Sequence, residues 1–238
     1  TSPRKRAWYV KTRDETFGGD REKMFRQYPS TLREAFSVAT EGRWLATQMA
    51  RARHDGRIMR LPVMPGVPVN SFWDLGVTTD ANCVWLHQKV GPWDHFVGFR
   101  ETLGEPYSAI VRLMQEFAAA HGCVWGTHYL PHDGDQTRPG STALKTPRVM
   151  LGDLGLRNIE IVPRISEVEI GIGQLREDFA TYRFDEAECK DGIVHLDGYA
   201  KKWNGAMATW STLVAENGHQ HAADAIRQKA QFAHNLRM

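Results

Sequence analysis

Three aspartates, far apart in the sequence, lie where strand ends or helix starts would present them. Asp74 lies in the apolar run SFWDLGV, Asp133 in YLPHDGD and Asp224 in HQHAADAIR. Carboxylate oxygens, together with water, are the preferred ligands of hard cations such as Mg²⁺ and Mn²⁺. Two such ions about 4 Å apart can activate water on one side of a phosphodiester and stabilise the leaving oxygen on the other. A fold that gathers the three aspartates could therefore hydrolyse phosphodiester bonds.

Each candidate residue also has a structural interpretation. An aspartate inside an apolar strand is costly unless it is paired or binds a metal, which makes Asp74 the most informative residue, yet backbone N–H groups at a strand end could satisfy it. Asp133 could instead form an Asx turn. His221 lies three residues before Asp224 on one expected helix face, but a lone helical histidine is more often a surface or capping residue. The residues alone leave these alternatives open.

The elements that position these residues can be predicted from hydrophobic periodicity. Short apolar runs separated by turns predict strands over 72–77, 83–90 and 95–101, arranged as an antiparallel meander. A helix over 106–121 is followed by a buried strand over 124–130 that we expect to be parallel to the first. Further helices are predicted from about 168, over 186–203 and from about 219. The pattern predicts an α/β chain with a central mixed β-sheet flanked by helices.

The composition excludes several classes of protein. With 42% apolar and 24% charged residues the chain resembles an ordinary globular protein, and no apolar run is long enough to cross a bilayer, so no membrane partner is expected. The opening TSPRKRAWYV lacks the apolar region of a signal peptide and looks like part of a longer chain. Cys83, Cys123 and Cys189 form no CxxC pair, which argues against a disulfide framework and predicts buried thiols.

Positive charge is concentrated near the start of the chain. Residues 1–60 contain 14 Lys and Arg against 7 Asp and Glu, whereas the net charge of the whole chain is only +2. This arm could bind a polyanion such as DNA, or it could be a solvated basic surface. It ends at LPVMPGVPV, residues 61–69, whose three prolines favour extended backbone. We expect a basic linker region over 1–65 and the main domain over 66–238.

Several segments, taken together, resemble the nuclease domain of tailed-phage large terminase subunits. WDLGVTTDANCVW resembles the first nuclease motif, YLPHDGD the second and HQHAADAIR the third. PRISEVEIGIGQLREDF and RFDEAECKDGIVHLDGYAKKW are similar to stretches between the motifs, and FRQYPSTLREAF resembles the segment that closes the ATPase domain of the full-length motor. The resemblance covers nearly the whole chain, and its specificity lies in the order and spacing of the motifs.

The resemblance implies an RNase H-like fold and a metal-dependent endonuclease that cuts concatemeric double-stranded phage DNA during genome packaging. It places metal-binding carboxylates at Asp74, Asp133 and Asp224, with His221 as a neighbour that binds or orients, and it implies two Mg²⁺ or Mn²⁺ ions as cofactors. Our hypothesis is that Asp74 bridges both ions while Asp133 and Asp224 each help to hold one. The run ENGHQ at 216–220 departs from the Asp-Trp-Ser-Ser or similar run of many relatives.

The expected partners follow from the same resemblance. Double-stranded DNA would be contacted mainly at its phosphates, for example by Arg138, Lys145 and Arg148, which would give strong salt sensitivity and little sequence preference. These three could equally be solvated surface charges. In the full-length protein the ATPase domain, the small terminase subunit and the portal are implied partners, and the cytoplasm of the bacterial host is the implied location. The sequence has no P-loop, so ATP hydrolysis would belong to a part of the protein outside this chain.

Two other functions fit parts of the pattern. Another RNase H-like nuclease, of the resolvase or transposase type, would use a similar carboxylate cluster, although the YPSTLREAF segment argues against it. A non-catalytic docking module of the packaging motor would use the aspartates only as structural residues. Metal-dependent cutting that is lost on Asp74→Asn would exclude the docking module.

Overall fold

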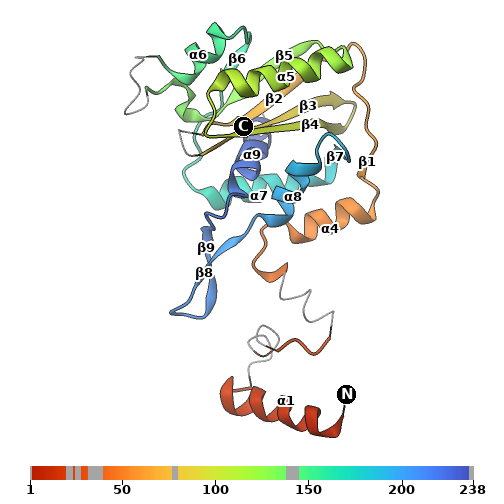
Figure 1. Cartoon of the computed structure of the whole chain (residues 1–238), viewed down its shortest axis with the longest axis vertical. Coiled ribbons are helices and arrows are strands. Elements are labelled where there is room, and N and C mark those ends of the chain that lie inside the picture. Colours follow the sequence, from red (N-terminus) through yellow and green to blue (C-terminus); the bar gives the residue numbers. More distant parts are fainter. Residues whose placement is uncertain are drawn as a thin grey trace.

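The computed structural model describes residues 2–19, 24, 28–31, 40–76, 80–137 and 145–235, so Arg138 lies outside the described residues. Its helices and strands follow one another as shown in Figure 1. In chain order they are α1 (Pro3–Thr16), α4 (Ala46–His54), β1 (Ile58–Met59), β2 (Val69–Asp74), β3 (Ala81–Val90), β4 (Trp93–Leu103), α5 (Tyr107–His121), β5 (Trp125–Leu130), the 3-10 turn η1 (His132–Asp135), α6 (Pro147–Asp153), β6 (Ile159–Ile161), α7 (Val168–Asp178), the 3-10 turn η2 (Phe179–Thr181), β7 (Tyr182–Asp185), α8 (Lys190–Gly198), β8 (Lys201–Asn204), β9 (Thr209–Val214) and α9 (Gln220–Asn235).

A seven-stranded mixed sheet forms the centre of the molecule, in the order β1-β7-β4-β3-β2-β5-β6. The strands β2, β3 and β4 pair antiparallel, which confirms the predicted meander. The pairing of β2 with β5 is parallel, also as predicted. The carboxyl ends of β2 and β5 therefore lie side by side at one edge of the sheet, where a site built from strand ends would form.

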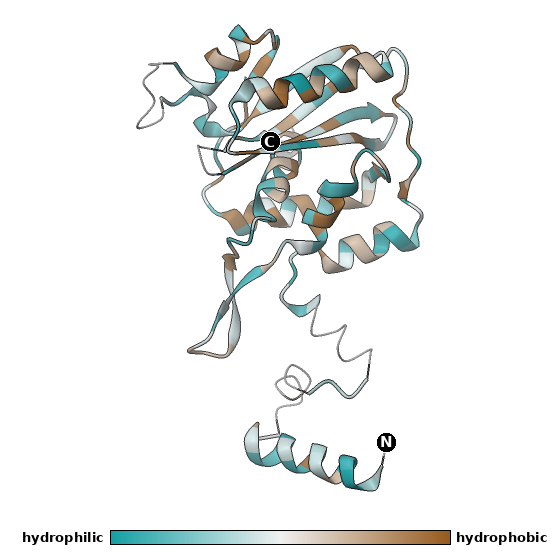
Figure 2. Ribbon diagram, in the orientation of Figure 1, coloured by the Kyte–Doolittle hydropathy of each residue, from teal (hydrophilic) through white to brown (hydrophobic). Residues whose placement is uncertain are grey.

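Helices cover both faces of this sheet, as Figure 1 shows. On one face Trp73, Val84 and Leu86 pack against α5 and α6, and on the other Trp85 and Phe96 pack against α7, α8 and α9. Because successive side chains of a strand point to opposite faces, one apolar strand can supply both cores. Figure 2 shows the apolar colouring that recurs along the strands and the helices around them. The predicted central mixed β-sheet flanked by helices is confirmed.

The body of the molecule begins before the proline-rich segment. Trp44, Leu45, Met49 and Ala52 are buried in the core on the α9 side of the sheet, and β1 pairs parallel with β7. By contrast, α1 has no buried residue and lies apart from the sheet (Figure 1). The expected division of the chain into 1–65 and 66–238 remains a prediction.

The helix predicted over 186–203 is wrong in its C-terminal part. The helix α8 ends at Gly198, and the chain then forms the hairpin of β8 and β9, with Trp203 41% exposed. A side chain at Gly198 would clash with the ring of His219, so glycine here lets α8 pack closely against the segment before α9. Pairing of Ala200 with Arg43 then draws the backbone into an extended form.

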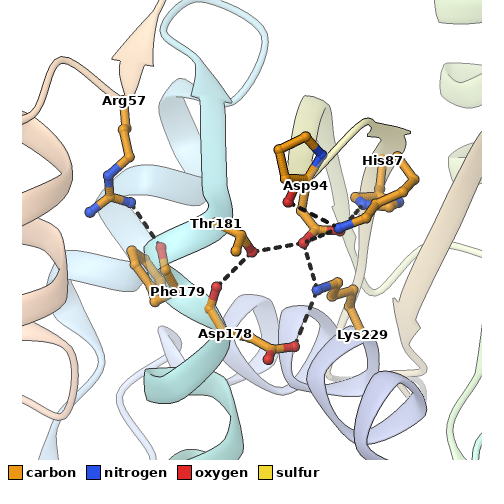
Figure 3. Close-up of polar contacts among 9 residues, drawn as sticks. Arg57, His87, Asp94, Asp178, Phe179, Thr181 and Lys229 are labelled. Atoms are coloured by element: carbon orange, nitrogen blue, oxygen red, sulfur yellow. Dashed lines mark hydrogen bonds and ion pairs between the residues drawn. The ribbon is translucent and has the colours of Figure 1, made fainter. Parts of the chain in front are cut away.

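A buried network of charges ties α9 to the sheet, as shown in Figure 3. Lys229 on α9 pairs with Asp94 on β4 at 2.9 Å and with Asp178 of α7 at 3.2 Å. Asp94 also accepts hydrogen bonds from His87 at 2.9 Å and from Thr181 at 2.8 Å. Although burial acts in the other direction, these partners hold the pKa of Asp94 well below its usual range.

The cysteines and the helices agree with an ordinary globular chain. Cys83, Cys123 and Cys189 are free thiols, and the predicted burial is confirmed for Cys83 and Cys189, whereas Cys123 is only partly buried. Among the described residues, no helix is both long and apolar enough to span a bilayer.

Candidate active site

Asp74 is the last residue of β2 and lies at the carboxyl end of that strand. The strand register pairs Asp74 with Cys83 of β3, and Cys83 with Glu101 of β4. Directly paired residues of antiparallel strands point to the same face, so these three side chains form a row across the sheet. Cys83 belongs to the core on the α9 side of the sheet, as does Trp85 two residues further along β3. Asp74 is therefore directed toward α9.

The helix α9 brings two of the predicted residues to Asp74. The Nδ1 atom of His221 lies 3.0 Å from Oδ2 of Asp74, and Asp224 follows one turn later. The buried face of α9 begins with Ala222, Ala223 and Ala225, whose small side chains let the helix approach the sheet. The indole Nε1 of Trp85 donates a hydrogen bond of 2.8 Å to the carbonyl of Ala222 and fixes the start of α9 on the sheet.

Asp224 is held in an environment that disfavours its charge. Burial raises the pKa of Asp224 to about 6, and the nearby carboxylate of Asp74 acts in the same direction, while Arg227 and His221 oppose them. Its Oδ1 atom is buried and has no hydrogen bond among the described residues, although Nη1 of Arg227 lies 2.8 Å away as an ion pair. A buried carboxylate needs compensating positive charge, and because its pKa stays raised beside Arg227, Asp224 is suited to an additional cation.

His221 is coupled to the same carboxylates. The hydrogen bond with Asp74 raises the pKa of His221, and the charges of Asp74, Asp80 and Asp224 add to this effect. The acidic surroundings thus favour the protonated, positively charged form of the His221 imidazole. A divalent cation at Asp74 would take over that role, because carboxylates that repel each other are stabilised by a shared cation.

The donor set fits a hard divalent cation. Asp74 and Asp224 supply carboxylate oxygens, with the imidazole of His221 beside them, and oxygen ligands are those that Mg²⁺ and Mn²⁺ prefer. As the side chains lie, no three His, Cys, Asp or Glu residues within the described ranges form a group that could hold one ion. The fit therefore rests on the chemistry of the donors and on the buried oxygen of Asp224.

Asp133 lies at the same edge of the sheet as Asp74. It is half-buried in η1, three residues after the end of β5, which is the parallel neighbour of β2. The structure thus brings Asp74, His221 and Asp224 together, and the role expected for Asp133 remains a prediction.

The basic residues beside the second motif are exposed and already paired. Lys145 forms an ion pair of 2.6 Å with Asp153, and Arg148 one of 3.0 Å with Asp135. Exposed ion pairs of this kind exchange readily for other anions. Their expected contacts with DNA phosphates remain a prediction, and Arg138 falls outside the described residues.

The sequence did not single out a chain of polar residues next to the candidate site. Glu101 pairs with Nε2 of His195 at 3.0 Å, and Nδ1 of His195 lies 3.0 Å from Nδ1 of His219. The hydrogen bond from His195 lowers the pKa of Glu101. These residues come from β4, from α8 and from the segment before α9, so only the strand register could have linked Glu101 to Asp74.

Comparisons with known proteins agree with this architecture. No family model matches the sequence, and no curated protein matches it significantly. Among solved structures, the large terminase from a thermophilic bacteriophage, in complex with ADP, matches with a TM-score of 0.54 and 12% identity, over 77% of this chain and 44% of that one. The large terminase nuclease from the thermophilic phage G20c with bound magnesium matches with a TM-score of 0.50 and 11% identity, over 79% of this chain and 96% of that one.

These matches establish the fold. The chain has the RNase H-like fold of large terminase nuclease domains, which confirms the fold that the sequence motifs implied. It spans less than half the length of the ADP-bound large terminase and nearly the whole length of the G20c nuclease with which it aligns.

Proposed function

We propose that this chain is the nuclease domain of a phage large terminase subunit and cuts concatemeric double-stranded DNA during genome packaging. The observation that carries the proposal is the meeting of Asp74, His221 and Asp224 at the carboxyl end of β2, where burial and the charge of Asp74 raise the pKa of Asp224. Its fold is shared with a terminase nuclease that binds magnesium. Proteins that share a fold can differ in function, so the proposal rests on the site more than on the likeness.

The side chains of the site have distinct roles in this proposal. Asp74, Asp224 and Asp133 would together hold two Mg²⁺ or Mn²⁺ ions, with Asp74 shared between them. The imidazole of His221 orients the carboxylate of Asp74 through their 3.0 Å contact, or it joins the ligands. Arg227 pairs with Oδ1 of Asp224 and partly compensates the charge of this carboxylate.

The cations, when bound, would polarise the scissile phosphodiester and favour ionisation of an attacking water. The chain supplies the fixed geometry: β2 is held by strands on both sides, and α9 is anchored by Trp85 at one end and by Lys229 at the other. None of the three cysteines offers a reactive thiolate, because burial raises the pKa of Cys83, Cys123 and Cys189. A protein nucleophile is therefore not part of the proposal.

The partners of this domain follow from the proposed function. Double-stranded DNA would be the substrate, bound mainly through its phosphates, in the cytoplasm of the bacterial host. In the full-length protein the domain would work with the ATPase domain, the small terminase subunit and the portal. One matched large terminase is described in complex with ADP, and this chain covers less than half of its length. Both facts agree with a nucleotide site outside this domain.

The test is plasmid cleavage by the purified chain with Mn²⁺, with Mg²⁺ or with EDTA. We expect metal-dependent conversion of supercoiled plasmid to cut forms, reduced at least about a hundredfold by Asp74→Asn and by Asp224→Asn, because each removes a carboxylate ligand. Asp133→Asn should reduce cutting similarly if it holds the second ion. Asp135→Asn serves as the matched control, since this exposed residue two positions further on pairs with Arg148.

Three results would contradict the proposal. Cutting that persists in EDTA would exclude metal dependence, and cutting that survives both Asp74→Asn and Asp224→Asn would exclude the site. A wild-type chain that folds but leaves plasmid intact with every metal would favour a docking module of the motor. Loss of cutting in Asp135→Asn to the same extent as in Asp133→Asn would remove the specific role of Asp133.

A further inference from the structure

A polar groove of about 450 Å³ lies at the start of α4, between this helix, α7 and β8. Three basic side chains line it, each from a different segment: Arg43, Arg176 and Lys201. The groove also contains Glu41, but none of the three cations pairs with a carboxylate within the described part of the chain. We call this site the cationic groove. Cations that converge on one groove favour an anionic ligand.

The contacts of the three cations orient them without neutralising them. Arg176 donates from Nε and Nη2 to the carbonyl of Trp44, at 2.9 and 2.6 Å. The ammonium group of Lys201 lies 4.8 Å from the centre of the Trp44 ring. Arg43 donates to the carbonyl of Gly198. Carbonyl oxygens and an aromatic ring are neutral partners, so the groove keeps the charge of its cations while their positions are fixed.

Backbone groups add to the attraction for an anion. The helix α4 starts at Ala46, and its N-cap residue Leu45 makes no side-chain hydrogen bond to the first turn. Thr47 and Gln48 of that turn line the groove, and the N–H groups of a first helical turn need acceptors from outside the helix. The indole Nε1 of Trp44, a residue only 5% exposed, is also buried without a hydrogen-bond partner among the described residues.

The cationic groove is joined to the candidate active site by a short series of contacts. The backbone N–H of Trp44 donates to the carbonyl of Tyr199 at 2.9 Å, and the hydroxyl of Tyr199 lies 3.5 Å from Nη1 of Arg227. Arg227 in turn pairs with Asp224 at 2.8 Å. The groove and the carboxylates therefore both lie on the α9 side of the sheet.

We infer that the cationic groove binds a backbone phosphate of the DNA, at a distance from the bond that is cut. This inference rests on the proposed function, since it takes DNA as the polyanion at the site. A phosphate offers several oxygen acceptors to the guanidinium and ammonium groups, and such contacts position DNA without reading its sequence. The groove thus supplies an anchor that holds the duplex across the acidic site.

The test is DNA binding in EDTA, measured by fluorescence anisotropy with a labelled duplex and the Asp74→Asn chain, which separates binding from cutting. We expect Lys201→Ala to weaken binding about fivefold or more at low salt. It should also flatten the slope of log K against log salt concentration by about 0.9, the value for one lost phosphate contact. Lys202→Ala is the matched control, because Lys202 is the next residue, is exposed and does not line the groove.

The same measurements can overturn the inference. Equal affinities and slopes for Lys201→Ala and Lys202→Ala, with both variants melting at the wild-type temperature, would show that the groove binds no DNA phosphate. Binding of inorganic phosphate that depends on Lys201, while Lys201→Ala leaves DNA binding unchanged, would limit the groove to small anions. DNA binding is measured without metal and plasmid cutting with it, so the two can fail separately. A chain that binds DNA through Lys201 yet never cuts plasmid with Mn²⁺ or Mg²⁺ would refute the proposed nuclease activity and retain the groove.

Discussion

The carboxyl group of Asp224 has a pKa well above that of an ordinary aspartate. Burial and the charge of Asp74 raise this pKa to about 6, so part of the population is protonated in mildly acidic solution. A cation binds the ionised carboxylate, and it must therefore displace a proton from Asp224 when the pH falls below that value. Asp74 raises the pKa of His221, and the protonated imidazole pairs with the carboxylate of Asp74. Falling pH therefore also strengthens the competition of His221 with a cation.

We predict that Mn²⁺ affinity falls steeply between about pH 7.5 and about pH 5. The loss should approach tenfold per pH unit below the pKa of Asp224, since one bound proton is displaced per ion. Isothermal titration calorimetry at both pH values measures it, with Asp224→Asn as the comparison. That variant should bind weakly throughout and show a shallower pH dependence. An affinity of the wild-type chain that is indifferent to pH would contradict the proton competition.

At the scale of elements, α9 is the helix that both forms the site and spans the sheet. Its first turns carry His221 and Asp224, and Lys229 near its other end is buried between Asp94 and Asp178 (Figure 3). Removing one member of a buried charge network leaves the remaining charges without compensation. The cost of losing Lys229 should therefore be far larger than the cost of losing a surface partner of the same aspartate.

We predict that Lys229→Met lowers the free energy of unfolding by about 3 to 5 kcal/mol. Lys89→Met is the control, because Lys89 pairs with the same Asp94 at 3.1 Å while its side chain is 54% exposed. That substitution should cost less than about 1 kcal/mol. Urea denaturation followed by circular dichroism gives both values. Equal losses for the two lysines would mean that burial does not decide the strength of this network.

The elements were predictable from sequence where local pattern and tertiary environment agree. Alternating apolar runs indicated β2 to β5, and the apolar stripe ended by Gly122 indicated α5, since these signals need only neighbouring residues. The hairpin of β8 and β9 was missed because a helix was predicted up to Trp203, whereas α8 ends at Gly198 and Ala200 pairs with Arg43, far away in the sequence.

The candidate site was predictable only in part. Asp74, His221 and Asp224 carried local signals in their own segments, and the structure gathers them. Glu101 had no such signal, because its proximity to Asp74 depends on the register of three strands. Arg43, Arg176 and Lys201 converge only after α4, α7 and the hairpin are assembled.

For the molecule as a whole, two segments before the proline-rich segment differ in burial: the one that contains α4 and β1, and the helix α1. The segment that contains α4 and β1 belongs to the core, with Leu45, Met49 and Ala52 fully or nearly fully buried. Arg57 is also buried and donates to the carbonyls of Phe179 and Tyr182. The helix α1 contributes no buried residue. Stability should therefore depend on the segment with α4 and β1 and not on α1.

We predict that a chain that starts at residue 40 folds with nearly the full stability, whereas a chain that starts at residue 66 does not fold. The shorter chain loses several buried side chains at about 1.5 to 3 kcal/mol each, which is comparable with the whole stability of a typical domain. Thermal melting and proteolysis of the two truncated proteins measure this. Cooperative melting of the 66–238 chain would place the domain boundary at the proline-rich segment instead.

The two outermost strands of the sheet are also its shortest. At one side β1 contains only Ile58–Met59, and at the other β6 contains only Ile159–Ile161. An exposed sheet edge offers unpaired backbone groups to other chains, and its length sets how many intermolecular hydrogen bonds can form. Edge strands this short can form few backbone hydrogen bonds with a second copy, so growth of the sheet from one copy into the next is disfavoured. The seven-stranded sheet is thereby protected against ribbon-like aggregation.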